Sequence, residues 1–146
     1  MTIDSERPLS NSAIYDTLLE LKAAGLVASS AAVATIVDLG LGKQEADVII
    51  DATAVEVASG DELYTIICEF SNSATFASGI VPGSMQYLGD AAAIPGGGDT
   101  DNGEGRYKLP FTNVINGVHY RYMRLYTVVA GTIATGVNYS AFITKK

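Results

Sequence analysis

Two stretches near the C-terminal end of the chain decide the fold. Residues 119–129 read His-Tyr-Arg-Tyr-Met-Arg-Leu-Tyr-Thr-Val-Val, and residues 137–144 read Val-Asn-Tyr-Ser-Ala-Phe-Ile-Thr. Apolar and polar side chains alternate in both, which is typical of half-buried β-strands. The second stretch places four apolar side chains on one face: Val137, Tyr139, Ala141 and Ile143. Gly131 and Gly136 indicate a turn between them, so the pattern predicts two strands joined by a turn.

Strand patterns continue toward the N-terminus. Residues 33–39, 46–52 and 63–70 are rich in β-branched and other apolar side chains, and turn residues such as Gly40 and Gly60 stand between them. In the third stretch, one face carries Tyr64, Ile66, Cys68 and Phe70. We therefore expect the Cys68 thiol in the core, where it behaves as a small hydrophobe. Several short strands separated by turns predict an all-β domain: a β-sandwich, a jelly roll or a barrel.

The chain divides into an arm and one domain. Residues 1–12 contain Pro8 and polar residues without periodicity, which predicts an N-terminal arm. Residues 13–146 form a single β domain, because 146 residues with 48% hydrophobic and 17% charged content can bury a core and are not disordered. Residues 13–24 fit two alternatives, a short helix that ends at Gly25 or a strand around residues 19–21.

Residues 71–110 are predicted to be mainly loop. They are rich in Ser, Asn and Gly, and they contain prolines at positions 82, 95 and 110. The Gly/Asp stretch at 96–105 is expected to be flexible and exposed between two strands.

The charged residues are divided unevenly along the chain. The net charge is −7, from 16 acidic and 9 basic residues. All sixteen acids fall in residues 1–104 with three basic residues, a net −13, whereas residues 105–146 hold six basic residues and no acid. The acidic total argues against nucleic-acid binding, which needs an excess of Lys and Arg. We expect acidic and basic strands to interleave and offset each other; the alternative is that the asymmetry marks a partner surface.

Few residues are suited to catalysis or metal binding. The chain has one histidine, His119, and one cysteine, Cys68. Jelly-roll metalloenzymes hold their metal through two or three histidines and a carboxylate, and no Gly-x-Ser-x-Gly motif marks a nucleophile. Residues 99–104 are faintly similar to a calcium loop, but Gly103 occupies the fifth position and no helices flank it. We therefore expect no enzyme activity, no metal and no cofactor.

No targeting or membrane segment is predicted. The first eight residues are polar and charged, unlike a signal peptide. The uncharged stretch 125–144 is long enough to span a bilayer, but its period of two indicates strands. We expect a protein that is made in the cytosol and does not bind a membrane.

Tyrosine and arginine side chains gather in residues 119–129. Alternation places Met123, Leu125 and Val129 on one side of the predicted strand. Tyr and Arg are enriched at the energetic centres of protein interfaces. The candidate subunit interface consists of Tyr120, Arg121, Tyr122, Arg124 and Tyr126. The alternative is that this stripe is only the half-covered outer face of a sheet.

Four stretches of the chain carry a family resemblance through their order and spacing. They are Leu19-Glu-Leu21 followed by Thr35-Ile-Val-Asp-Leu-Gly40; Gly60-Asp-Glu-Leu-Tyr64 followed by Ala74-Thr-Phe76; Leu109-Pro110 followed by Arg121-Tyr-Met-Arg-Leu-Tyr126; and Gly131 through Gly136 followed by Asn138-Tyr-Ser-Ala-Phe-Ile143. In this order the chain resembles the jelly-roll cement, or decoration, proteins of tailed-bacteriophage capsids. The resemblance implies a β-sandwich in which residues 19–21 are a strand, and it implies no enzyme activity and no cofactor.

The resemblance also implies a function. Such a protein binds the outer surface of the capsid and clasps neighbouring major capsid protein subunits. We therefore expect a structural virion protein, made in the host cytoplasm, that self-associates as a dimer, the commonest symmetric state. The alternative is a small β-sandwich binding module for glycans or a host surface, which could itself be carried on the virion.

Overall fold

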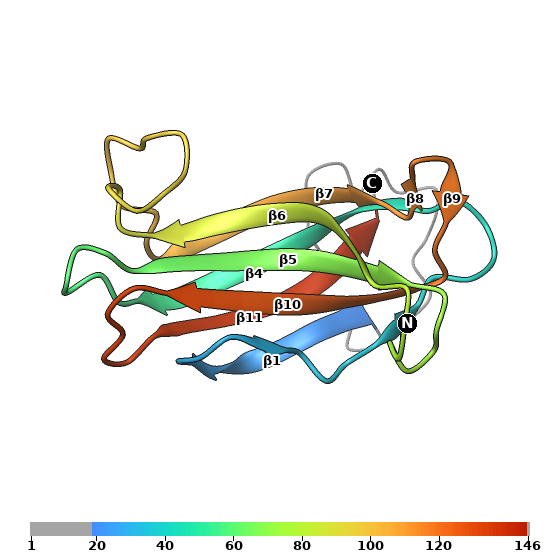
Figure 1. Ribbon diagram of the computed structural model, residues 1–146, viewed down its shortest axis with the longest axis horizontal. Coiled ribbons are helices and arrows are strands. Elements are labelled where there is room, and N and C mark those ends of the chain that lie inside the picture. Colours follow the sequence, from blue (N-terminus) through green and yellow to red (C-terminus); the bar gives the residue numbers. More distant parts are fainter. Residues whose placement is uncertain (1–18, 146) are drawn as a thin grey trace, which may run out of the picture.

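Two antiparallel β-sheets pack face to face in the computed structural model, which describes residues 19–145 (Figure 1). The first sheet has the order β1 (Glu20–Val27), β11 (Val137–Lys145), β4 (Glu45–Val55), β7 (Gly105–Thr112). The second has the order β2 (Ala31–Ala32), β10 (Tyr122–Ala130), β5 (Leu63–Ser71), β6 (Val81–Gly89), and β3 (Val37–Asp38) also pairs with β10. A small hairpin joins β8 (Val114–Ile115) and β9 (Val118–His119). The predicted all-β sandwich is confirmed; the predicted arm at 1–12 lies outside the described residues.

The core lies between the inner faces of the two sheets. The faces predicted for β5 and β11 are buried, as are Met123 and Leu125 of β10. Burial raises the pKa of the Cys68 thiol to about 12, so the thiol stays protonated as expected. The hydroxyls of Thr127 and Tyr139 hydrogen-bond across the core at 2.5 Å. This bond joins β10 to β11 and satisfies two buried polar groups that would otherwise destabilise the core.

Residues 71–110 are mainly loop, as predicted, at 72–80 and 90–104, but they also contain β6 and most of β7, which the sequence did not predict. The prolines that suggested loops, Pro82 and Pro110, lie inside these strands. Both strands are at the edges of their sheets, where a residue without an N–H group is tolerated because one side of the strand has no partner. The connection between them, residues 90–104, contains an exposed Gly/Asp stretch, as predicted.

The N-terminal part of the domain is strand where it is described. β1 begins at Glu20 and continues through Gly25, so Gly25 does not end a helix. The rest of the helix alternative, residues 13–18, lies outside the described residues. The Lys22 ammonium group donates hydrogen bonds to the carbonyls of Gly25 and Tyr139 at 2.9 and 2.8 Å, where the pairing of β1 with β11 shifts register. Because Lys22 satisfies these carbonyls, the irregular edge strand stays attached to the sheet.

Residues 33–39 do not form the single strand that their sequence predicts. Two separate two-residue strands, β2 and β3, flank an irregular segment, and each pairs with β10. The segment is the outer edge of the second sheet. Edge strands are commonly short or interrupted, because this leaves few free backbone groups for pairing with other chains. The interruption between β2 and β3 fits their position at the edge of the sheet.

The turn between β10 and β11 carries the chain from one sheet to the other. Gly131 and Gly136, predicted to be turn residues, have φ angles of 96° and 101°. At Gly136 an added Cβ would overlap the backbone carbonyl of Val27. Gly117, in the β8–β9 turn, also has a positive φ, 78°, but open space surrounds it. A Cβ at Gly117 would therefore cause backbone strain alone, whereas a Cβ at Gly136 would also collide with the β1 backbone.

Gly136→Ala should destabilise the protein more than Gly117→Ala. The left-handed backbone alone costs a residue with a Cβ about 1 kcal/mol, so Gly117→Ala should lower the free energy of unfolding by that amount. Gly136→Ala must also displace the β1 backbone, and a loss of about 3 kcal/mol is expected. Urea denaturation followed by tyrosine fluorescence measures both. Equal losses would show that the contact with Val27 contributes nothing.

Candidate functional site

The loops of the sandwich gather at two opposite ends with different chemistry (Figure 1). This follows from the antiparallel pairing of the long strands. We call one the acidic end; it consists of residues 56–62, 90–104 and 131–136. We call the other the apolar end; it consists of residues 39–44, 72–80 and 113–121.

The acidic end carries most of the acids that have no basic partner. Its loops contain no Lys or Arg and seven acidic residues: Glu56, Asp61, Glu62, Asp90, Asp99, Asp101 and Glu104. Several of these carboxylates accept hydrogen bonds from backbone N–H groups of the same loops. Asp61 accepts from the N–H of Thr132 at 2.9 Å, and Asp101 accepts from the N–H of Ala91 at 3.0 Å. The acids therefore order the loops and leave this end strongly negative.

The apolar end exposes three large aliphatic side chains. Leu41 is 84% exposed, Ile80 41% and Val118 46%. Each comes from a different loop, and each stands next to a glycine in a turn. The sequence reasoning missed these residues, although an apolar side chain beside a turn glycine is a signal that could have found them. Ile80 and Val118 line a common hollow, and Leu41 belongs to another loop at the same end. Exposed apolar groups of this kind are typical of interaction surfaces.

The charges of the apolar end are internally paired. Its loops contain two Lys or Arg residues, Lys43 and Arg121. Lys43 lies 3.1 Å from Glu45, and Arg121 lies 2.8 Å from Asp38. Hydrogen bonds from Arg121 lower the pKa of Asp38 to about 2, so the pair stays charged at neutral pH. A partner that covers the three apolar side chains therefore meets no unpaired Lys or Arg charge in these loops.

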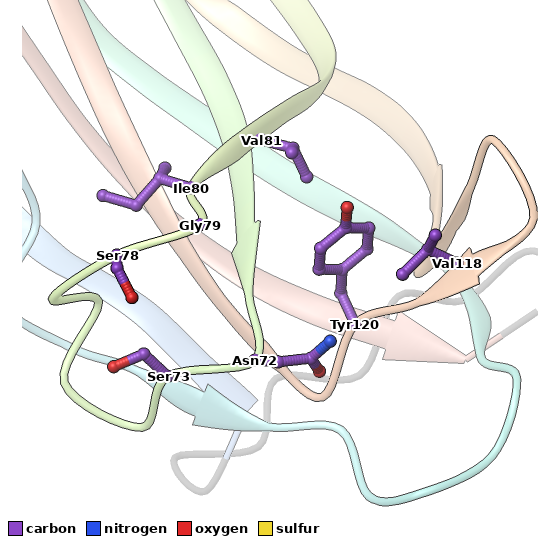
Figure 2. A pocket seen from close by; sticks show the side chains of 8 residues that line it. All are labelled: Asn72, Ser73, Ser78, Gly79, Ile80, Val81, Val118 and Tyr120. Carbon is purple, nitrogen blue, oxygen red and sulfur yellow. The ribbon is translucent and has the colours of Figure 1, made fainter.

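A hollow of about 530 Å³ lies at the apolar end, and Figure 2 shows the side chains that line it. Its lining consists of Asn72, Ser73, Ser78, Gly79, Ile80, Val81, Val118 and Tyr120. The Tyr120 ring lies on the side of Val118, opposite Ser73 and Ser78. The Asn72 amide donates to the carbonyl of His119 and accepts from the N–H of Arg121, both at 3.0 Å. Asn72 therefore fixes the backbone on both sides of Tyr120 and shapes the hollow.

The four basic side chains of the C-terminal third that the structure describes are paired with acids of the first two thirds. The pairs are Arg106–Asp51 at 2.7 Å, Lys108–Asp47 at 3.5 Å, Arg121–Asp38 at 2.8 Å and Arg124–Glu69 at 2.9 Å. Arg106 lies opposite Asp51 in the register of β7 and β4, and Arg124 lies opposite Glu69 in that of β10 and β5. The prediction that acidic and basic strands interleave is confirmed for these pairs.

Three of the five predicted interface residues share the outer face of β10. Tyr122, Arg124 and Tyr126 alternate with inward-facing core residues, as predicted. Tyr120 does not join them, because the chain is irregular between β9 and β10 and Tyr120 packs against the edge of the core. Arg121 binds Asp38. Participation of these residues in a subunit contact stays a prediction.

The Arg124 side chain contacts one acidic and one aromatic side chain. Its guanidinium group bonds Glu69 and lies 4.4 Å from the centre of the Phe76 ring, which the β5–β6 loop places over the sheet. The side chains of Arg124 and Glu69 are only 18% and 16% exposed. The pair therefore holds the β5–β6 loop, which lines the hollow, against β10.

The residues considered for catalysis are not brought together. Cys68 is buried in the core, whereas His119 is exposed on β9. Within residues 19–145, no three acidic, His or Cys side chains are grouped closely enough to hold a metal ion. In the same part of the chain, no helix is long and apolar enough to cross a membrane.

Comparison with protein-family models gave no match, and no curated protein is similar enough in sequence to count as a relative.

Arg124→Met should destabilise the protein more than Arg106→Met. The Arg124 pair is mostly buried and also contacts Phe76, so its loss leaves Glu69 without a partner; a loss of about 2 kcal/mol is expected. Arg106 is 54% exposed, and loss of an exposed pair costs about 0.5 kcal/mol. Thermal and urea denaturation of both variants measure the difference. If Arg124→Met leaves stability unchanged, the pair does not anchor the loop.

Proposed function

We propose that this chain is a structural cement protein that binds the outer surface of a tailed-phage capsid and stabilises contacts between major capsid protein subunits. The observation that carries the proposal is the apolar end, where Leu41, Ile80 and Val118 are exposed and the Lys and Arg side chains of the same loops are paired with acids. The centre of a protein interface is depleted in charge and rich in apolar contacts. The apolar end is therefore the proposed docking surface.

The strand order supports the family resemblance on which this proposal draws. If β2 and β3 are counted as one strand and the β8–β9 hairpin is left aside, residues 19–145 contain eight main strands. One sheet then holds the first, eighth, third and sixth strands, and the other holds the second, seventh, fourth and fifth. This is the order expected of a double-sheet jelly roll. We infer a jelly roll, the fold that the resemblance to cement proteins implies.

The proposed mechanism is mass action. A protein that binds only the assembled lattice stabilises that lattice by an amount that grows with the logarithm of its free concentration relative to its Kd. Many copies on one shell act together, so each contact can be weak. The acidic end would point away from the shell, and the net negative charge disfavours binding to packaged DNA. The protein would reach the outer surface of the virion after synthesis in the host cytoplasm.

Self-association is part of the same proposal. The outer face of β10 offers Tyr122 and Tyr126, which flank the internally paired Arg124. Tyrosines contribute strongly to interface energies, and a two-fold dimer through this face would leave both apolar ends free. Charge reversal at Arg124 would test this face, but it would also break the pair with Glu69 and destabilise the fold. Self-association and the stability of the variant must therefore be measured together.

A second candidate function is a binding module for glycans or a host surface. The hollow beside Tyr120 favours it, because the hollow combines an aromatic ring with the hydroxyl-bearing Ser73 and Ser78. Ligand sites are typically concave, with apolar walls and a few polar groups. Saturable glycan binding by the wild type that is lost in Tyr120→Ala would support this function over the first.

Leu41→Asp combined with Ile80→Asp should weaken capsid binding at least tenfold. The two carboxylates would have to lose their water in the contact, and 1.4 kcal/mol of lost binding energy already corresponds to a factor of about ten. Both side chains are exposed, so stability should change by less than about 0.5 kcal/mol for each. Co-sedimentation with capsids stripped of the protein measures the affinity.

Leu26→Asp is the matched control for this experiment. Leu26 is 58% exposed on β1, outside the apolar end. The control should bind capsids like the wild type. If the double variant also binds like the wild type, the apolar end is not the docking surface; if the wild type does not co-sediment at all, the cement function itself is wrong.

A further inference from the structure

The outer face of the first sheet carries side chains that are buried although they lie outside the core. The inward-facing residues of β4 and β11, such as Val48 and Ile143, pack in the core between the sheets. The residues that alternate with them point to the opposite face. Among these, Ile49 is 5% exposed and Phe142 3%, and Asp47 is buried as well. We call Asp47, Ile49 and Phe142 the outer strip.

The strand register places the residues of the outer strip side by side. Ile49 lies opposite Phe142 across β4 and β11, and Phe142 lies opposite Glu20 of β1. Asp47 lies two residues before Ile49, on the same face of β4. From Ala46 to Ile50, β4 is therefore buried on both faces. A strand of this kind normally has a layer of chain over each face, whereas the long strands of the described chain form two layers only (Figure 1).

Two long side chains of the neighbouring strand β7 border the outer strip. The guanidinium carbon of Arg106 lies 5.8 Å from the centre of the Phe142 ring, and the Lys108 ammonium lies 3.5 Å from Asp47. Both basic side chains are more than half exposed. They cover one margin of the strip, and they do not account for the nearly complete burial of Ile49 and Phe142.

Asp47 adds a polar requirement to whatever covers the strip. Its Oδ2 atom is the one that faces the Lys108 ammonium. Its Oδ1 atom is buried and has no hydrogen-bond partner in the part of the chain that the structure describes. A buried acceptor without a donor destabilises a fold. A peptide segment laid over the strip would offer it backbone N–H groups.

The chain that precedes β1 starts beside the outer strip. Because Glu20 lies opposite Phe142, the chain before Glu20 leaves the sheet next to the Phe142 side chain. Two strand spacings, about 10 Å, separate β1 from β4, and four extended residues already span about 13 Å. Residues 13–18 read Ala-Ile-Tyr-Asp-Thr-Leu and supply three large, mainly apolar side chains. Thr17 adds a hydroxyl donor to the N–H groups of the segment.

We propose that residues 13–18 of the same chain dock on the outer strip and form a third layer over the first sheet. Their apolar side chains cover Ile49 and Phe142, and one of their donors reaches Oδ1 of Asp47. The strip is buried within a single chain, which favours this occupant over a second copy. A tethered segment also meets its own sheet at a high effective concentration. The inference does not depend on capsid binding; it closes this face of the sandwich to other partners.

Thiol labelling of the full chain tests the proposal. Ile49→Cys introduces a thiol into the outer strip, and this thiol should react slowly with a water-soluble disulfide reagent while residues 13–18 cover it. Ile14→Asp combined with Leu18→Asp places two charges in the proposed contact and should accelerate the reaction by about tenfold or more, because the segment is released. An unchanged rate at position 49 overturns the proposal.

Cys68 reports unfolding in the same samples. Burial keeps its thiol protonated, so it reacts only when the core opens. Peptide mapping of both thiols therefore separates release of the segment from unfolding of the domain.

Ile67→Cys is the matched control for position. Ile67 alternates with the core residues of β5 and is partly exposed on the outer face of the second sheet. Its labelling rate should be the same with and without Ile14→Asp and Leu18→Asp. Dilution tests the other occupant: protection of position 49 that is lost as the protein is diluted would assign the cover to a second copy and overturn the proposal.

A measurement on the wild type decides if the two Asp substitutions unfold the chain, which equally fast labelling of Cys68 would show. Nuclear Overhauser effects between the Ile49 methyl groups and side chains of residues 13–18 are expected in NMR spectra of the full chain. Their absence, when Ile49 shows such effects with Phe142, refutes the docking.

Discussion

Burial of the inner faces of four central strands holds the sandwich together, and everything at its two ends depends on that burial. β4 and β11 pair along their length in one sheet, and β5 and β10 do so in the other. The hydroxyls of Thr127 and Tyr139 link the two pairs through the core. Because these strands fix the positions of six loops, residues that are far apart in sequence can form a surface at either end without contributing to the core.

On the outer faces of the sheets, the described basic side chains of the C-terminal third pair with acidic side chains from earlier in the chain. Each described basic side chain beyond residue 104 has an acidic partner, and two of the pairs lie directly across neighbouring strands. Opposite charges placed across strands stabilise the pairing locally, so the basic third is not a free basic surface in its described part. Among the described residues, the acidic side chains without a basic partner gather mainly at the acidic end.

The sequence predicted the strands whose alternating pattern results from burial of one face. It did not predict the strands that depend on their position at the edge of a sheet. β5, β10 and β11 alternate because one face of each is buried. Pro82 and Pro110 suggested loops, and only their location on edge strands allows them in β6 and β7. The exposed side chains of the apolar end carry a local signal, an apolar residue beside a turn glycine, but their placement at one end of the sandwich depends on the strand order.

Desolvation explains why the two ends should have different roles. At the acidic end, carboxylates such as those of Asp61 and Asp101 bind backbone N–H groups and remain partly hydrated. A partner that covered them would have to remove that water without supplying opposite charge, which costs several kcal/mol per ion. At the apolar end, cover over Leu41, Ile80 and Val118 releases water from apolar surface and is favourable. Covering the apolar end is therefore favourable, whereas covering the acidic end is costly.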